Sequence, residues 1–233
     1  MPDRAGARRP PRAAASSPAR AAGARRPAPE RLGVRKTYKL FIAGAFPRSE
    51  SGRSYPVTGA DGALLAHAAR ASRKDARDAV TAARAAFAAW SGATAYNRGQ
   101  VLYRVAELLD GRAAQFTATS VQNEGLSAAE AGRAVAAAID RWVWYAGWPD
   151  KIAQVAGAAN PVAGPYFNFS VPEPTGVVAV VAPAGSGLLG LVSVLAPVIA
   201  SGNTGSWWPA RLIRWPRSRS PRCWRHRTCR PAW

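Results

Sequence analysis

Three glycines with regular spacing are the residues of this chain best suited to chemistry. Gly185, Gly187 and Gly190 spell G-x-G-x-x-G, a pattern that can bring backbone N–H groups at a helix N-terminus close to a phosphate. A dinucleotide site also needs a second strand and an acidic residue about 20 residues further on, but no Asp or Glu follows Glu173. The other interpretation is that the glycines only permit a tight turn, and both interpretations stay open.

The elements around these glycines can be predicted from apolar patterning. The β-branched run Val177–Val181 predicts one buried strand, and residues 188–200 are apolar on every face, with Pro197 inside. We therefore expect a strand, a glycine-rich turn and a buried helix, which together form the opening half of a βαβ unit.

The preceding part of the chain predicts helices and a few short strands. Two serines are followed three residues later by an acid, Ser72 by Asp75 and Ser127 by Glu130, and each pair predicts a capped helix start. Further helices are expected from about residue 97 to a stop at Asp110-Gly111, and then through Val121. Strands are expected at 38–46, with Gly44 at a turn or bulge, and at 54–57 and 64–69. Extended chain is expected at 161–174, with strand alternation at 167–171. Trp142, Trp144, Tyr145 and Trp148 form an aromatic cluster that we interpret as helix packing.

The net charge of +19 lies mainly in the two ends of the chain. Residues 1–36 carry +8, residues 205–233 carry +8 and the middle carries +3. Nucleic-acid binding would need a basic face on the fold, so no nucleic-acid partner is expected. The chain has no unbroken apolar run of about 18 residues, so no membrane partner is expected either.

Residues 1–35 are predicted to be a disordered basic extension, because Arg, Ala, Pro and Ser cannot bury enough apolar surface to order the chain. No apolar segment follows Arg8-Arg9, so we expect a cytoplasmic protein and not an exported one. His67 has no companion ligand nearby and is expected to be structural.

After Thr204 the composition changes abruptly. Residues 205–233 hold eight Arg, five of the nine Trp and no acid. We interpret them as an unfolded tail read out of frame. The alternative is an Arg–Trp segment that contacts RNA or anionic lipid. Cys223, His226 and Cys229 offer three ligands where a zinc site needs four, so no metal site is expected.

The order of several short motifs resembles the aldehyde dehydrogenase family. They run from Leu40-Phe41-Ile42-Ala43-Gly44 through Gln122-Asn123-Glu124-Gly125 to Ser201-Gly202-Asn203-Thr204 and cover about residues 36–204. The resemblance implies an α/β fold, in which a helical region with a small sheet precedes the start of a dinucleotide-binding parallel sheet that is incomplete. The expected organisation is a disordered basic extension at 1–35, a partial family domain at 36–204 and the unfolded tail at 205–233.

The resemblance also implies a function and a site. The family oxidises aldehydes to acids with NAD or NADP through a Cys nucleophile and a Glu base, and both would lie beyond this chain. The resemblance places the cofactor-contacting turn at Val181, Ala182, Pro183, Ala184 and Gly185. Gly185 stands where the family has an Asn that stabilises an oxyanion, so no catalytic residue is assigned.

The expected function is therefore that of a fragment of an aldehyde dehydrogenase-like oxidoreductase that is inactive as this chain. The alternative is a non-catalytic relative that oligomerises, through the small sheet near 167–171, with itself or with an active partner. The extended segment 161–174 corresponds in the family to a strand of a small oligomerisation sheet.

Overall fold

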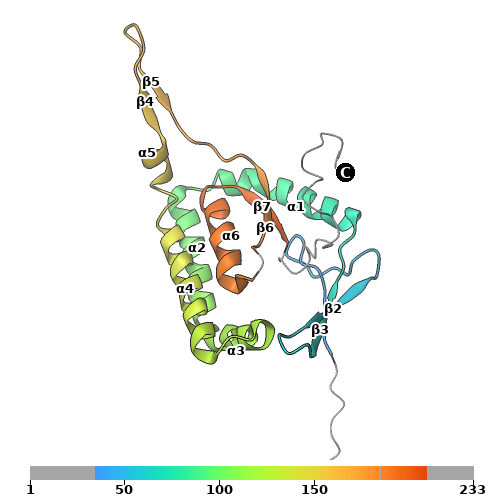
Figure 1. Ribbon diagram of the computed structural model, residues 1–233. Coiled ribbons are helices and arrows are strands. Elements are labelled where there is room, and N and C mark those ends of the chain that lie inside the picture. Colours follow the sequence, from blue (N-terminus) through green and yellow to red (C-terminus); the bar gives the residue numbers. More distant parts are fainter. Residues whose placement is uncertain (1–34, 184, 209–233) are drawn as a thin grey trace, which may run out of the picture. The chain divides into compact units, whose positions relative to one another are not determined.

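The computed structural model describes residues 35–183 and 185–208 of the 233-residue chain. Helices and strands are mixed along the chain (Figure 1). In order, the elements are β1 (Thr37–Tyr38), β2 (Ser54–Thr58), β3 (Leu64–Ala69), α1 (Arg73–Ser91), α2 (Ala95–Asp110), α3 (Ala113–Glu124), α4 (Ala128–Ala146), α5 (Ile152–Ala156), β4 (Ala158–Asn160), β5 (Asn168–Ser170), β6 (Val177–Val181), α6 (Gly187–Ala200) and β7 (Thr204–Trp208).

Both predicted capping boxes are confirmed. At α1, the Ser72 side chain accepts from the backbone N–H of Asp75 at 3.2 Å, and the Asp75 carboxylate accepts from the backbone N–H of Ser72 at 2.7 Å. Ser127 and Glu130 make the same reciprocal pair at α4. Each box satisfies N–H groups that a helix start leaves without an intrahelical partner.

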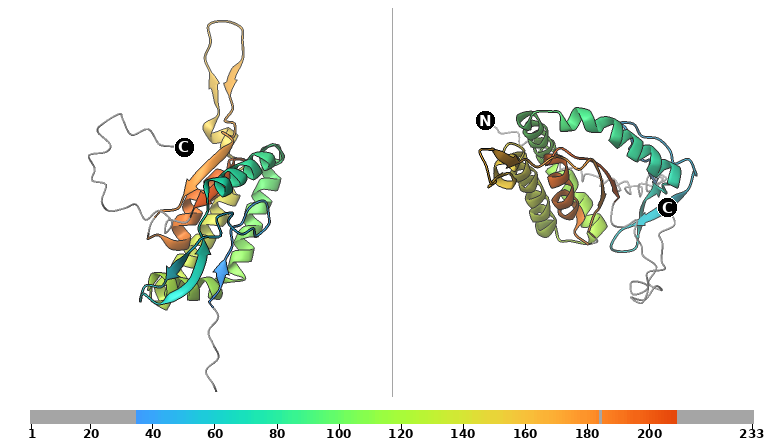
Figure 2. Two further views of the ribbon diagram at one scale, coloured as in Figure 1. Left: turned by 90° about the vertical axis from the view of Figure 1, so that its right-hand side faces the viewer. Right: turned by 90° about the horizontal axis from the view of Figure 1, so that it is seen from above.

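The core lies where α4 packs against α2 and α6 (Figures 1 and 2). Its most buried members come from these three helices and include Leu102, Ala138 and Ala196. The absence of a side chain at Gly99 allows α2 to approach α4 closely, because a Cβ there would lie 2.8 Å from the carbonyl oxygen of Ala146. Gly99 therefore allows the close contact between the start of α2 and the end of α4.

The small sheet has the order β1-β3-β2, with β1 parallel and β2 antiparallel to β3. The predicted strands at 54–57 and 64–69 are confirmed. The predicted strand at 38–46 is wrong beyond Tyr38, but the turn predicted at Gly44 is confirmed. Residues 42–45 form a two-residue turn instead, with Ala43 at φ 52° and Gly44 at φ 78°, because positive φ at both central positions is what such a turn requires.

Strands β4 and β5 form an antiparallel hairpin that extends away from the helices (Figures 1 and 2). The alternation at 167–171 predicted a strand, and β5 occupies its central three residues. Phe167 and Phe169 are exposed, and their ring centroids lie 5.5 Å apart. The hairpin therefore presents aromatic side chains to solvent.

Strands β6 and β7 are parallel, and all five residues of each are paired, from Val177 with Thr204 to Val181 with Trp208. The expectation that 205–233 is an unfolded tail is therefore wrong for residues 205–208, which lie in β7, and the expected boundary at 204 falls at the first residue of that strand. The backbone of β6 provides the ladder, and Thr and Trp are residues that strands favour. The predictions for 1–34 and 209–233, including Cys223, His226 and Cys229, lie outside the described residues.

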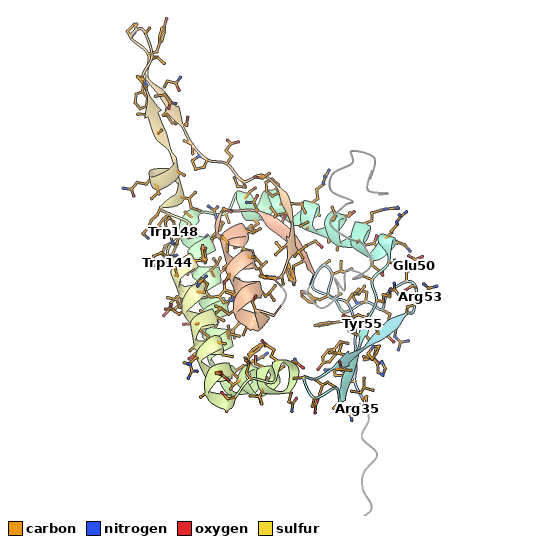
Figure 3. The ribbon with its side chains drawn as sticks, in the orientation of Figure 1. Arg35, Glu50, Arg53, Tyr55, Trp144 and Trp148 are labelled. Carbon is orange, nitrogen blue, oxygen red and sulfur yellow. The ribbon has the colours of Figure 1, made fainter. Side chains whose placement is uncertain are left out.

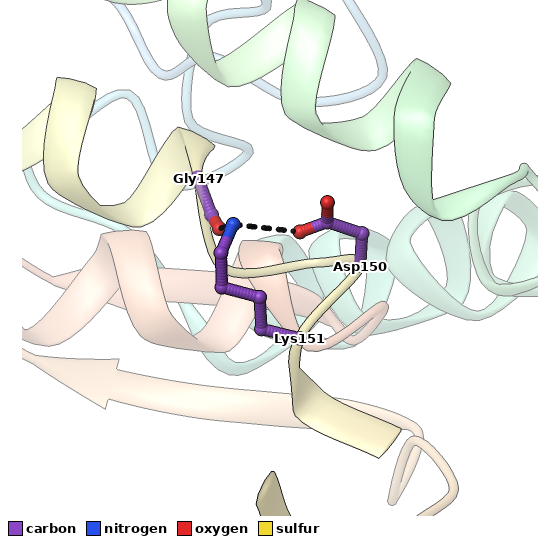
Figure 4. A network of polar contacts seen from close by, with 3 residues as sticks. All are labelled: Gly147, Asp150 and Lys151. Carbon is purple, nitrogen blue, oxygen red and sulfur yellow. Dashed lines mark hydrogen bonds and ion pairs between the residues drawn. The ribbon is translucent and has the colours of Figure 1, made fainter. Parts of the chain in front are cut away.

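The expected helix packing is confirmed for Trp142 and Tyr145, which both pack in the helix core. Trp142 is buried in the core, whereas Trp144 is exposed and contacts Trp148, with ring centroids 6.0 Å apart (Figure 3). Just after α4, Lys151 Nζ donates to the carbonyl oxygen of Gly147 and pairs with Asp150 at 3.1 Å (Figure 4). A lysine at this place complements the negative end of the helix dipole.

Candidate cofactor turn between β6 and α6

The start of β6 is held by a buried amide. Asn203 is 8% exposed, and its Oδ1 accepts a 2.8 Å hydrogen bond from the backbone N–H of Gly176. Its Nδ2 donates to Ser201 Oγ at 2.9 Å. The loop before β7 thereby fixes the strand that leads into the turn.

The predicted cofactor residues differ in exposure. Val181 is 50% exposed at the end of β6, Ala182 is only 7% exposed, and Pro183 is exposed. Gly185 has a φ of 76°, and a Cβ there would meet no atom within 4 Å. Ala184 lies outside the described residues. The turn is therefore open to solvent at Pro183 and Gly185, whereas Ala182 packs inward.

Each glycine of the G-x-G-x-x-G pattern has a structural reason. Gly185 and Gly187 both have positive φ, 76° and 49°, where a side chain is strained. A Cβ on Gly190 would overlap the side chain of Ser186. These observations support the interpretation of the pattern as a tight turn that leads directly into α6.

The carboxylate of Glu124 lies against the first residue of α6. A Cβ on Gly187 would overlap both carboxylate oxygens of Glu124. Glu124 is the last residue of α3, which ends at Gly125 in the left-handed conformation, with φ 72°. A negative group at a helix N-terminus interacts favourably with the helix dipole. The Glu124 carboxylate therefore occupies the position at which this dipole would stabilise a bound anion.

Polar contacts from two other helices fix α6. Arg141 of α4 donates to Ser193 Oγ at 3.1 Å, and Ser193 Oγ donates to the carbonyl oxygen of Leu189 at 2.7 Å. Trp90 of α1 donates from Nε1 to the carbonyl oxygen of Ile199 at 3.1 Å. These bonds hold the middle of α6 and its C-terminal turn against α4 and α1.

The residues of the turn do not fit a pyrophosphate at the N-terminus of α6. The charge beside Gly187 is the carboxylate of Glu124, which would repel a phosphate. Ser186 at the N-cap makes no side-chain capping bond, so the Glu124 carboxylate is the feature that opposes a phosphate at this place.

Two cavities lie away from this turn. One, of about 320 Å³, lies between α2 and the end of α4 and is lined by Tyr96, Tyr103 and Asp150, among others. The other, of about 650 Å³, is lined by residues 203–207, by the alanine-rich face of α1 and by residues 38–43. The described residues of the turn line neither of them. Within the described residues no group of three or more His, Cys, Asp or Glu side chains could hold a metal ion.

The model of the Aldehyde dehydrogenase family matches residues 47–214, a stretch that includes β6, the turn, α6 and β7. The chain therefore belongs to the aldehyde dehydrogenase family. This confirms the resemblance seen in the sequence, and the mixed helix and strand architecture agrees with it. No helix within 35–183 or 185–208 is long and apolar enough to cross a membrane.

Several relatives and solved structures cover the same part of the chain. Retinal dehydrogenase 2 from Gallus gallus is 35% identical over 174 residues, which are 72% of this chain and 33% of that protein. Omega-crystallin from Enteroctopus dofleini is 29% identical over 76% of this chain and 36% of the relative.

Among solved structures, HpcC from Thermus thermophilus superposes with a TM-score of 0.70 at 29% identity, over 74% of this chain and 33% of HpcC. PnpE in complex with nicotinamide adenine dinucleotide gives the same TM-score and identity, over 74% and 35%. The chain thus spans about a third of the length of the curated relatives it matches.

Sequence reasoning missed Glu124 as a neighbour of the turn. The segment Gln122-Asn123-Glu124-Gly125 is one of the motifs that resemble the family, and Gly125 signals a helix end. The local signal therefore predicts where α3 stops. It does not predict that Glu124 meets a helix about 60 residues later, because that contact depends on how α3 and α6 pack.

Proposed function

We propose that this chain is the N-terminal portion of an NAD- or NADP-dependent aldehyde dehydrogenase-type protein, whose intact form oxidises an aldehyde to a carboxylic acid. The supporting observation is the family match across β6, the turn, α6 and β7. The complex of PnpE with nicotinamide adenine dinucleotide supports use of this cofactor in the family. In this proposal, Val181, Ala182, Pro183, Ala184 and Gly185 are the turn that faces the cofactor.

We also propose that this chain alone is catalytically inactive. Gly185 cannot donate a side-chain hydrogen bond to an oxyanion, and losing one such donor costs on the order of 10²–10³ in rate. The part of the family that the chain matches is not expected to contain the Cys nucleophile or the Glu base. Among the described residues that line the 650 Å³ cavity beside β7, there is no thiol, and the one carboxylate is Asp75, which is engaged in capping α1.

An absorbance assay for the reduced cofactor tests this directly. The full chain is incubated with acetaldehyde or benzaldehyde and with NAD or NADP, beside an active family enzyme as the positive control. We expect no turnover above the buffer rate, and Gly185→Asn should not restore it because the nucleophile is still missing. Sustained cofactor reduction that depends on both aldehyde and protein would refute the proposed inactivity.

Cofactor binding by this chain is expected to be weak, because Glu124 lies at the N-terminus of α6. Titration of NAD against tryptophan fluorescence, with adenosine as an uncharged comparison, measures this. Millimolar or weaker affinity for NAD agrees with the proposal. Micromolar affinity would show that the turn binds the dinucleotide without the remaining part of the sheet.

A non-catalytic role in oligomerisation is the second candidate. The β4–β5 hairpin exposes 76% of Tyr166, 82% of Phe167 and 61% of Phe169, an apolar surface that a partner could cover. Mixing the chain with an active family enzyme and measuring co-elution tests this. The double variant Phe167→Ser/Phe169→Ser should lose co-elution if the hairpin is the contact, and unchanged co-elution would exclude it.

A further inference from the structure

The positive charge of the described chain is concentrated in residues 35–84. These residues carry ten basic and four acidic side chains, a net charge of +6, whereas residues 85–208 carry six basic and seven acidic side chains, a net charge of −1. The average over the middle of the chain conceals this difference. Most of the basic charge of the fold therefore lies in the small sheet, its loops and the first part of α1.

Hydrogen bonds hold the loop before β2 against the start of α1. The backbone N–H of Glu50 donates to the carboxylate of Asp75 at 3.2 Å. The backbone N–H of Arg70 donates to the carbonyl oxygen of Arg53 at 2.8 Å. Glu50 and Arg53 therefore lie beside the start of α1 (Figure 3). The α1 basic surface consists of the six exposed basic residues of this loop and of the start of the helix, which are Arg48, Arg53, Arg70, Arg73, Lys74 and Arg77.

We propose that the α1 basic surface binds the phosphate backbone of a nucleic acid without reading its bases. Five of its six residues are arginines, and a guanidinium group pairs with phosphate through two parallel hydrogen bonds. The acidic residues among them are Glu50 and Asp78, which are exposed, and Asp75, which is buried, so positive charge is in excess. Residues 48–53 and 70–78 contain no large apolar side chain, and burial of such side chains supplies much of the affinity of a membrane-binding surface. A nucleic acid therefore fits this surface better than a membrane does.

The position of these basic residues is unfavourable for the stability of α1. Arg73 and Lys74 are the first two residues of the helix, where the helix dipole favours acidic side chains and disfavours cations. A general excess of arginine does not explain them either, because residues 85–208 have a net negative charge. A bound phosphate backbone would offset the repulsion among these cations, so binding accounts for a placement that helix stability does not.

The exposure of this surface does not come from the end of the described sheet at β7. None of its six basic residues lines the cavity of about 650 Å³ beside that strand. The two ends of the chain have the same sign of charge as the surface, since residues 1–34 have a net charge of +6 and residues 209–233 hold eight Arg and no acidic residue. Neither end can therefore neutralise the surface. Each end could bind a polyanion itself, so the experiment has to separate the ends from the α1 basic surface.

Four triple variants of the full chain, each losing three positive charges, make this separation. In the order α1 basic surface, matched control on the helices α2 to α4, N-terminal end and C-terminal end, they are Arg53→Gln/Lys74→Gln/Arg77→Gln, Arg104→Gln/Arg112→Gln/Arg133→Gln, Arg8→Gln/Arg9→Gln/Arg12→Gln and Arg211→Gln/Arg214→Gln/Arg217→Gln. The first should weaken binding of a labelled DNA duplex about tenfold or more, and should lower the slope of log K against log salt by about 3, because each lost phosphate contact removes about 0.9. Each of the other three should weaken binding less than about threefold.

Fluorescence anisotropy of the duplex between about 0.05 and 0.2 M salt measures these constants. Circular dichroism should show that the surface variant is folded and at least as stable as wild type, because it removes cations from the start of α1. Failure of the wild-type chain to bind the duplex would overturn the proposal, as would tighter binding to phosphatidylserine vesicles or a strong preference between two duplexes of unrelated sequence. Equal weakening in all four variants would mean that net charge alone decides, and a loss confined to an end variant would mean that this end binds. Either result would also overturn it.

Discussion

Asn203 and Gly176, 27 residues apart, are joined by a 2.8 Å hydrogen bond from a backbone N–H to a buried side-chain oxygen. This bond connects the loop before β7 to the residue before β6. The parallel ladder of these two strands therefore begins with a side chain, and the backbone bond from Thr204 to Gly176 follows directly after it.

Replacing Asn203 by Ala should destabilise the protein by about 1–3 kcal/mol, because the N–H of Gly176 then loses its partner in a partly buried position. Chemical denaturation followed by circular dichroism measures the change. Asn160→Ala is the matched control, since Asn160 bonds Asn168 and Ser170 on the exposed hairpin, and we expect it to cost less than about 0.5 kcal/mol. An equal loss of unfolding free energy in the two variants would contradict the role assigned to Asn203.

Asp75 should be the most important single carboxylate for stability among the described residues. It is 6% exposed, and it accepts hydrogen bonds from Ser49 Oγ at 2.7 Å, from the N–H of Ser72 at 2.7 Å and from the N–H of Glu50 at 3.2 Å. Asp75→Asn should cost about 2–4 kcal/mol, because an amide cannot accept all these bonds. Asp78→Asn, on an exposed position of the same helix, should be nearly neutral.

The same residue predicts an acid sensitivity. Burial by itself raises the pKa of the Asp75 carboxyl, but the hydrogen bonds from Ser49, Ser72 and Glu50 outweigh it and hold the pKa below its usual value. The stabilisation is therefore complete above the unfolded pKa of about 3.9 and is lost as pH falls through the lower folded pKa. Unfolding curves from about pH 6 down to about pH 2 should show a smaller acid loss for Asp75→Asn than for wild type.

Gly187 and Glu124 should be energetically coupled. Gly187→Ala introduces a side chain at φ 49° and against the Glu124 carboxylate, and should cost about 1–3 kcal/mol. In the Glu124→Ala background the steric part disappears and the backbone strain remains, so the cost should be smaller. A double-mutant cycle measures the difference, and strict additivity would show that the carboxylate moves aside freely.

Local signals in the sequence predicted much of this fold. Ser72 with Asp75 and Ser127 with Glu130 specify helix starts through bonds spanning three residues, and Gly125 specifies a helix end through its backbone conformation. Strand β7 was missed because Thr204–Trp208 has no apolar alternation. It forms because β6 supplies a backbone ladder and α1 packs against it. The position of Glu124 beside α6 was missed for the same reason, since only tertiary packing creates it.

Limited trypsin digestion should remove both ends of the chain and leave its central part intact. Composition predicts that residues 1–35 lack a packed core, and β7 extends the paired structure to Trp208. We therefore expect early cleavage within 1–35 and at Arg211 and Arg214, and a resistant product close to 36–208. Mass spectrometry of the time course identifies the fragments. Cleavage within α1 or α4 before the ends are removed would contradict this organisation.

The bonds that hold α1 in place have a consequence for synthesis. The side chain of Thr204 donates to the carbonyl oxygen of Ala83, 121 residues earlier, and Trp90 donates to Ile199, 109 residues later. Apart from its capping contacts, α1 packs mainly against β7 and β6. During translation, this helix therefore emerges long before the strands it rests on exist. Its apolar face therefore stays exposed until nearly the whole described chain has left the ribosome. Chaperone binding or misassembly can occur during this interval.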